Sequence, residues 1–319
     1  MGVIYLGLQV VAGSLAIWLS KELRLASAAT TLIALIPTVP GAFLTWSGYR
    51  GDRSESAPDL DAKANVLARA VLASETHQAN QLLGQGGHRI DLAFHYFPEP
   101  TNNAAGADLH GRLSDVLPYY RRLRPARLVI TGEPGAGKTL LALNLLLTLL
   151  NDLAPTDPVP VRLSLANWDT SQPLQAWLAE QISERFSDRG ISLADARALV
   201  EHNRVLPVLD GLDEMDATGT PVARRRAVRA VDRLNAYQNA LGRAPLVLTC
   251  RTAQYGELAA ADVRMREAAR IEIEPVDTTR AIAYLNVRIT NPDRWRPVLA
   301  TLVSNHGGPL ARSLDTPWR

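Results

Sequence analysis

Residues 127–150 read RLVITGEPGAGKTLLALNLLLTLL, and this segment is the strongest indication of the fold. The apolar run 127–131 predicts a strand, and the strong helix formers that follow Lys138 predict a helix. Between them stands GEPGAGKT, a glycine loop of the kind that binds phosphates when a strand precedes it and a helix follows it. Lys138 is one of only three lysines in the chain, which argues against a chance match.

Each part of this loop has a chemical role. Glycines allow a tight turn whose backbone N–H groups surround phosphates, and the helix that follows adds the positive end of its dipole. We expect Lys138 to reach the β- and γ-phosphates of a nucleotide, and the Thr139 hydroxyl to ligate Mg²⁺. The predicted nucleotide-binding residues are Gly132, Glu133, Pro134, Gly135, Ala136, Gly137, Lys138 and Thr139.

A second motif, VLPVLDGLDE, occupies residues 205–214. Its apolar run ends in Asp210, and a carboxylate at the tip of a strand beside the phosphate loop can hold the water shell of Mg²⁺. Thr139 and Asp210 are therefore the predicted metal-binding residues. Asp213 and Glu214 lie where one of them could orient or deprotonate an attacking water. The alternative is a solvated acidic turn around a glycine.

A third motif, PLVLTCRT at 245–252, delivers Thr249 and Arg251 to the same edge of the predicted sheet. Arg251 could sense the γ-phosphate or stabilise its charge during transfer, and the alternative is a surface salt bridge. The predicted catalytic residues are thus Asp213, Glu214 and Arg251. Cys250 is the only cysteine, which excludes an internal disulfide and favours a buried, unreactive thiol.

The apolar runs of residues 127–276 predict an α/β domain. Runs at 127–131, 159–165, 204–209, 245–250 and 270–273 alternate with helix-like stretches, which is the pattern of a parallel sheet covered on both faces. Pro207 lies inside one run, and proline is unfavourable in a central strand. We therefore expect either that pairing on one side starts after Pro207, or that a bulge lies there.

The first fifty residues differ from the rest. Val3–Leu19 and Leu25–Trp46 are uncharged and largely apolar, and each is long enough to span a bilayer. We predict a transmembrane helical hairpin over residues 1–50; a single span and a secretory signal peptide are the alternatives. Because a nucleotide-binding domain requires ATP, we expect a multi-pass protein of the plasma membrane with its NTPase domain in the cytoplasm.

The remaining segments carry little chemistry. Residues 51–61 read as a linker, and 62–83 as a helix; the whole of 51–123 is interpreted as a linker and small adaptor segment. The net charge of +2 indicates no specific nucleic-acid partner. A cluster of five arginines is interpreted as a solvated helix face rather than a partner or lipid surface; it comprises Arg224, Arg225, Arg226, Arg229 and Arg233.

Taken together at these separations, GEPGAGKT, VLPVLDGLDE and LVLTCRT resemble the NACHT NTPases, a branch of the STAND ATPases. The DGLDE element, with two carboxylates that follow Asp210 closely, is the most discriminating of the three. The resemblance covers about residues 128–275, and the apolar start makes the chain similar to the membrane-anchored bacterial type. It implies an NTPase domain over 124–276 and the start of a helical domain over 277–319.

The resemblance also implies a fold and an activity. The fold is a three-layer P-loop NTPase with strand order 5-1-4-3-2, and the ligands are ATP or ADP with Mg²⁺. The implied protein is a slowly hydrolysing signalling switch that self-associates on activation. Members of the family normally continue into a winged-helix domain with a nucleotide-binding histidine, a role that His306 does not match. The sequence therefore predicts a C-terminally truncated member.

Two other functions share these motifs. A mechanochemical ATPase of the AAA+ kind would need an arginine finger that points into the site of a neighbouring subunit. No single arginine in the sequence stands out as a candidate for this role. A non-catalytic scaffold stabilised by nucleotide would lack a working Asp213 and Glu214 pair. Transporter ATPases and GTPases are not favoured, because no LSGGQ-like or NKxD-like element is present.

Overall fold

The computed structural model describes residues 38–83, 90–98, 105–239, 242–289, 291–305 and 308–316. Contacts divide the chain into two compact units, 1–59 and 60–319. The first predicted membrane span and residues 25–37 of the second lie outside the described residues. Among the described residues, no helix combines the length and the apolar character needed to cross a bilayer.

The described residues form a seven-stranded sheet with the order β2-β1-β9-β3-β8-β5-β4. Its parallel strands are β3 (Arg127–Gly132), β4 (Val159–Ser164), β5 (Val205–Asp210), β8 (Leu246–Arg251) and β9 (Ala269–Ile273). If these strands are numbered 1 to 5 along the chain, their order across the sheet is 5-1-4-3-2. The predicted α/β class and strand order are confirmed.

The register of the parallel strands aligns their carboxyl ends. Gly132 at the end of β3 is opposite Arg251 at the end of β8, and Asp210 at the end of β5 is opposite Ser164 at the end of β4. Pairing of β5 with β8 begins at Val208, immediately after Pro207, as one of the two sequence-based alternatives predicted. Open parallel sheets bind ligands at this edge.

Antiparallel strands extend the sheet at the β9 edge. β1 (Ala93–Tyr96) pairs with β9, and β2 (His110–Arg112) pairs with β1. The sequence predicted strand character at 90–96 but not its partner. The segment before residue 124 therefore contributes to the main sheet. A separate two-stranded ribbon comprises β6 (Gln238–Asn239) and β7 (Gly242–Arg243).

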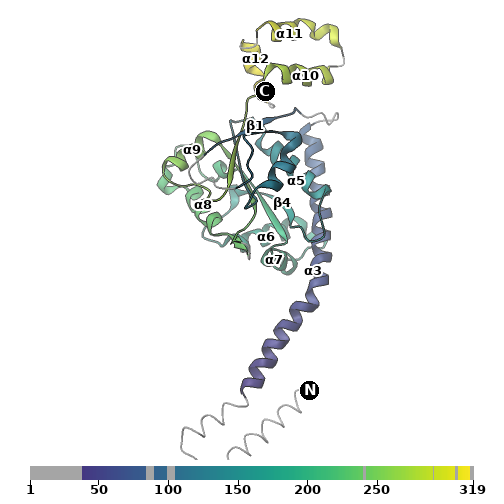
Figure 1. Ribbon diagram of the computed structural model, residues 1–319, viewed down its shortest axis with the longest axis vertical. Coiled ribbons are helices and arrows are strands. Elements are labelled where there is room, and N and C mark those ends of the chain that lie inside the picture. Colours follow the sequence, from purple (N-terminus) through teal and green to yellow (C-terminus); the bar gives the residue numbers. More distant parts are fainter. Residues whose placement is uncertain are drawn as a thin grey trace, which may run out of the picture. The chain divides into compact units, whose positions relative to one another are not determined.

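Helices cover both faces of the sheet, with α5 and residues 60–83 of α3 on one side and α8 and α9 on the other (Figure 1). The parallel strands are almost fully buried, and β3 has a buried residue at every position. The described helices are α3 (Thr38–Leu83), α4 (Val116–Arg122), α5 (Lys138–Asn151), α6 (Leu174–Phe186), α7 (Leu193–Glu201), α8 (Arg226–Ala236), α9 (Thr252–Ala260), α10 (Thr278–Arg288), α11 (Pro292–Ser304) and α12 (Pro309–Ser313). Single 3₁₀ turns are η1 (Leu113–Asp115), η2 (Leu165–Asn167), η3 (Ser187–Arg189), η4 (Leu212–Met215) and η5 (Val222–Arg224).

Helix α3 is longer than the sequence predicted. It includes residues 51–61, the segment interpreted as a linker, so that segment is helical. Proline removes one backbone donor and strains the helix locally, but Pro58 does not end this one. From Leu60 onward α3 belongs to the same compact unit as the sheet, and Leu67 and Val71 are fully buried against it.

Candidate functional site

The loop between β3 and α5 has a conformation that only glycine adopts without strain. Gly135 and Gly137 have φ angles of +79° and +96°, in the left-handed region. A Cβ atom on Gly132 would lie 3.2 Å from the Ala136 Cβ and 3.3 Å from the Ile273 Cβ, so the strand end is also tightly packed. Gly137 is the N-cap of α5, and no side chain caps the helix. The free N–H groups at this end can therefore receive an anion.

Lys138 folds back over the loop. Its Nζ donates to the backbone oxygens of Gly132, at 2.9 Å, and Glu133, at 3.0 Å. Burial lowers the pKa of the Lys138 ammonium, an effect that the nearby Asp213 carboxylate opposes. The ammonium thus lies directly over the glycine loop, where a phosphate oxygen could replace either carbonyl.

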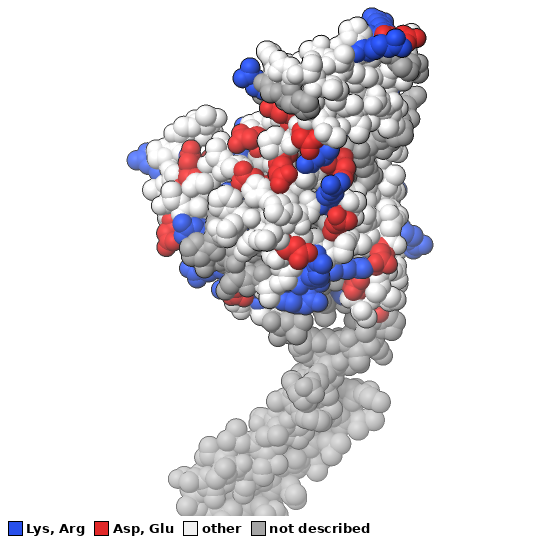
Figure 2. Space-filling view, turned by 45° about the horizontal axis from the view of Figure 1, so that its top comes forward, with Lys and Arg blue, Asp and Glu red and all other residues white. Residues whose placement is uncertain are grey.

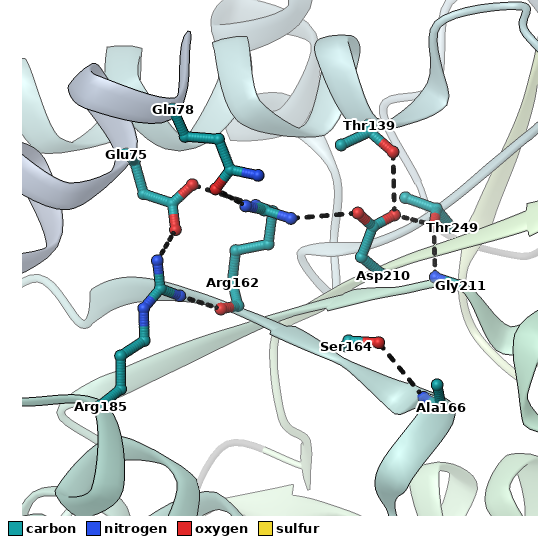
Figure 3. A network of polar contacts seen from close by, with 10 residues as sticks. All are labelled: Glu75, Gln78, Thr139, Arg162, Ser164, Ala166, Arg185, Asp210, Gly211 and Thr249. Atoms are coloured by element: carbon teal, nitrogen blue, oxygen red, sulfur yellow. Dashed lines mark hydrogen bonds and ion pairs between the residues drawn. The ribbon is translucent and has the colours of Figure 1, made fainter. Parts of the chain in front are cut away.

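Asp210 is held from three elements (Figure 3). Its Oδ1 accepts a hydrogen bond from the Thr249 hydroxyl of β8 at 2.5 Å, and the Thr139 hydroxyl of α5 lies 3.5 Å from the same oxygen. Its Oδ2 lies 3.3 Å from Nη1 of Arg162 on β4. The Thr249 hydroxyl also accepts a bond from the Gly211 N–H at 2.8 Å. These contacts fix the carboxylate so that Oδ1 is directed toward Thr139.

The turn after Asp210 presents Glu214. Gly211 has a φ of +81°, and a Cβ there would lie 2.8 Å from Glu214 Oε2. The Glu214 N–H donates to the Gly211 oxygen at 3.0 Å, which closes the turn. Desolvation, together with the charges of Asp213 and Asp210, raises the pKa of the Glu214 carboxyl above its usual range. A carboxylate of raised basicity beside a phosphate site is suited to accept a proton.

Both carboxylate oxygens of Asp213 contact Arg251. Its Oδ1 accepts the Arg251 backbone N–H at 3.0 Å, and its Oδ2 lies 2.8 Å from the Arg251 Nε. The Asp213 side chain is only 6% exposed, whereas that of Arg251 is 45% exposed. The carboxylate is therefore a buried anchor, and the guanidinium beyond it remains accessible.

These residues surround one cavity of about 230 Å³ at the carboxyl edge of the sheet. It is lined by Pro134, Gly135, Gly137, Lys138, Thr139, Asp210, Gly211, Asp213, Glu214, Thr249 and Arg251. One hydroxyl and one carboxylate suit Mg²⁺ when phosphate oxygens and waters complete its shell. Among the described residues there is no cluster of three or more His, Cys, Asp or Glu side chains that could hold a metal by themselves.

The comparison with protein families now decides the assignment. The family model described as the NACHT domain matches residues 126–292, which include the glycine loop, Asp210 and Arg251. The chain belongs to the NACHT family. The glycine loop and the sheet edge described above therefore belong to a NACHT P-loop NTPase domain.

Other comparisons add little to this NACHT assignment. No curated protein matches the chain. A solved structure described as the Aeropyrum pernix ORC1 protein in complex with DNA is similar at 17% identity, with a TM-score of 0.39. That similarity covers 63% of this chain and 55% of the ORC1 chain, so this chain spans about half the length of that relative.

The structure brings every sequence-predicted site residue of the NACHT domain to the same sheet edge. The sequence did not identify two contacts of Asp210. Thr249 was placed at this edge without a partner, and Arg162 was not singled out. A charged residue inside the apolar strand VPVRLS was a signal that could have identified Arg162, because a buried charge requires a partner.

The arginine cluster is not simply a solvated face, as the sequence had suggested. Arg226 donates to the backbone oxygens of Met215, at 2.9 Å, and Ala166, at 3.2 Å. Arg225 pairs with Glu257. The prediction holds for Arg224, Arg229 and Arg233, which are exposed, but not for Arg225 and Arg226, which lie at the start of α8 and are partly buried. Elsewhere, on the face shown in Figure 2, basic and acidic side chains are interspersed.

Cys250 is buried in β8, and the structure records it as a free thiol. Its side chain is fully enclosed. Burial raises the pKa of the thiol well above its ordinary value. The prediction of a buried cysteine is confirmed, and the raised pKa makes the thiol a poor nucleophile.

Proposed function

We propose that this NACHT chain is a nucleotide-dependent switch that binds ATP or ADP with Mg²⁺, hydrolyses ATP slowly, and self-associates in its ATP-bound form. One observation supports it above all. Residues of the glycine loop, together with Thr139, Asp210 and Glu214, line the same cavity. Phosphoryl transfer to water requires that phosphate binding, metal binding and a base converge in this way.

Different residues would bind the phosphates and the Mg²⁺ ion of the nucleotide. The N–H groups of the loop and the α5 N-terminus would hold the phosphates. Lys138 would exchange its bonds to the Gly132 and Glu133 carbonyls for phosphate oxygens. Thr139 and Asp210, whose oxygens lie 3.5 Å apart, would hold Mg²⁺. That ion, when bound, would neutralise the charge that develops on the phosphate oxygens.

Glu214 is the proposed general base. It would take a proton from the water whose oxygen attacks the γ-phosphorus, while the bond from that phosphorus to the bridging oxygen breaks and ADP leaves. Asp213 is not available for this role, because both of its oxygens are engaged by Arg251. Asp213 would instead position Arg251, whose accessible guanidinium could contact the γ-phosphate.

The test begins with the nucleotide itself. We would purify the 319-residue chain, denature it, and identify any released nucleotide by chromatography, with Lys138→Ala alongside. We expect ADP from the wild type and none from the variant, since the variant lacks the phosphate-binding ammonium. Equal nucleotide content in both would overturn the role of the P-loop. No nucleotide in either, with no binding of added Mg²⁺-ATP, would overturn the proposed function.

Two further measurements separate the switch from its alternatives. Release of inorganic phosphate measures turnover, and a chain that binds ATP without releasing phosphate is a scaffold. Light scattering in ADP and in a non-hydrolysable ATP analogue measures assembly. A switch is expected to be small with ADP and larger with the analogue. A mechanochemical ring would turn over rapidly and remain assembled in both.

The membrane hairpin over residues 1–50 remains part of the proposal. It is supported by the uncharged, apolar composition of Val3–Leu19 and Leu25–Trp46, and it places the NTPase domain in the cytoplasm. Fractionation of cells that express the chain, followed by an alkaline wash, tests it. The chain should remain with the membranes, and a variant without residues 1–37 should not. Recovery of the intact chain in the supernatant would refute the anchor.

A further inference from the structure

Helix α3 carries a fully buried carboxylate. Glu75 has no exposed surface, and it lies on the same stripe of α3 as the buried Leu67 and Val71. Burial of a charge is costly unless it is paired and hydrogen-bonded. Glu75 meets this requirement with two arginines: its Oε2 lies 3.1 Å from Arg162 Nε, and its Oε1 lies 2.7 Å from Arg185 Nη2.

Arg162 connects α3 to the metal-binding carboxylate. Its Nε contacts Glu75, its Nη2 donates to the Gln78 side-chain oxygen, and its Nη1 lies 3.3 Å from Asp210 Oδ2 (Figure 3). The guanidinium is planar, so these three directions are fixed relative to one another. A shift of Glu75 or Gln78 therefore rotates or withdraws the nitrogen that contacts Asp210.

Arg185 of α6 fixes the other side of the cluster. Its Nη1 donates to the backbone oxygen of Arg162 at 2.9 Å, and its Nη2 donates to the Ser74 hydroxyl at 2.9 Å as well as to Glu75. The cluster thus holds two guanidinium and two carboxylate groups, Glu75 and Asp210. The formal charges of the cluster therefore balance, and the Arg162 guanidinium is shared between Glu75 and Asp210.

We propose that Arg162 and Glu75 are positioning residues for Asp210, and that through them the docking of α3 is coupled to Mg²⁺ binding at the nucleotide site. The inference rests on the proposed function, since it requires that Asp210 holds Mg²⁺. With Oδ2 engaged by Arg162 and Oδ1 by Thr249, the carboxylate has one orientation, with Oδ1 toward Thr139.

The coupling is reciprocal. If the contacts of α3 change the affinity for Mg²⁺, then Mg²⁺ changes the stability of α3 docking by the same factor. Coupling of this kind typically amounts to roughly 5- to 150-fold in affinity. Residues 60–83 would then report the state of the nucleotide site to the part of the chain that precedes them.

Glu75→Gln tests the coupling, because it keeps the shape of the side chain and removes its charge. Asp210 would then be the only carboxylate paired with Arg162, and Arg162 would compete more strongly with Mg²⁺. We would titrate Mg²⁺ against binding of a fluorescent ADP analogue to the 319-residue chain. We expect wild-type affinity in EDTA and a Mg²⁺ requirement raised roughly 5- to 50-fold.

The matched control is Lys63→Gln. Lys63 Nζ lies 3.1 Å from Asp195 Oδ2 of α7, so this variant also removes an ion pair of α3, but one that does not reach Asp210. It should have a wild-type Mg²⁺ requirement. Gln78→Ala is a milder second variant, which removes one bond to Arg162 without leaving a buried charge unpaired. It should raise the Mg²⁺ requirement by a few-fold.

Hydrogen exchange of residues 60–83 gives a readout that does not depend on turnover. Mg²⁺ added to the ADP-bound chain should change the exchange of these amides in the wild type and in Lys63→Gln, but much less in Glu75→Gln. The inference is overturned if the wild type binds nucleotide in a Mg²⁺-dependent manner while Glu75→Gln and Gln78→Ala match it in both measurements. A wild type that binds no nucleotide overturns the proposed function, and the coupling with it.

Discussion

The Thr249 hydroxyl offers a sharp test of how Asp210 is held. It donates to Asp210 at 2.5 Å and accepts the Gly211 N–H at 2.8 Å, and Thr249 as a whole is only 1% exposed. Thr249→Val keeps the shape and removes both bonds. Thr249→Ser keeps both bonds and removes one methyl group. The pair of variants therefore separates hydrogen bonding from packing at one buried position.

The magnitudes follow from these contacts. A hydrogen bond to a charged group contributes about 1.5–3 kcal/mol, and a buried N–H left without a partner costs about 1–3 kcal/mol. Because Asp210 is 16% exposed and water can reach it, we expect Thr249→Val to lose about 2–4 kcal/mol. Loss of one buried methyl group costs about 1 kcal/mol, which is the expectation for Thr249→Ser.

Urea unfolding of the nucleotide-free chain measures both values, provided that the m-values of the variants agree. The Mg²⁺ dependence of nucleotide binding is measured in parallel. Thr249→Val should require more Mg²⁺ than the wild type, because Asp210 has lost the donor that orients Oδ1. Thr249→Ser should not. A valine variant as stable as the serine variant, with an unchanged Mg²⁺ requirement, would refute the role assigned to the hydroxyl.

Three further predictions concern the same sheet edge. Glu214→Gln should bind ATP normally and lose about 10²–10⁴-fold in hydrolysis, measured as phosphate release. In the wild type, the rate of hydrolysis should fall as the pH is lowered and Glu214 becomes protonated. Because the pKa of Glu214 is raised, this fall should begin at a higher pH than for an ordinary glutamate. Gly211→Ala should lose about 1–2 kcal/mol on unfolding and most of its hydrolysis, because its Cβ would displace the Glu214 carboxylate; full activity would contradict the placement of that side chain. Cys250 should react with a thiol reagent only as the domain unfolds, so labelling as fast as that of a free thiol would contradict its burial.

Much of the nucleotide site was predictable because its chemistry is local in sequence. The phosphate loop lies in one stretch of residues, and its glycines and Lys138 are specified by the backbone that phosphates require. Asp210 and Arg251 each end an apolar run, and parallel strands bring such ends to one edge. The strand order came from the family resemblance, because apolar runs predict strands without specifying their neighbours.

The extension of the sheet was not predictable from local pattern. β1 pairs with β9, which lies far along the chain, and the alternation at 90–96 identifies a strand but no partner. Helix α3 illustrates a similar limit. Polar residues and Pro58 indicated a linker, whereas the structure has helix from Thr38 to Leu83.

The buried charges were visible in the sequence, but their pairing was not. Glu75 lies four residues after Val71 and four before Ala79, on an apolar stripe of a predicted helix. Arg162 interrupts an apolar strand in the same way. Each position indicates a buried charge that needs a partner. Only the fold shows that Glu75 and Arg162 pair with each other, because α3 and β4 are far apart in sequence.

The three contacts of Asp210 connect this carboxylate to three separate parts of the fold. The strands are packed too tightly to move independently, but each donor to Asp210 leads to a different element: Thr139 to the phosphate loop, Thr249 to β8 and hence Arg251, and Arg162 to α3. A ligand that draws Asp210 toward Thr139 must weaken its contact with Arg162. Under the proposed coupling, the freed guanidinium would pair more fully with Glu75, and the docking of α3 would change without any movement of the sheet.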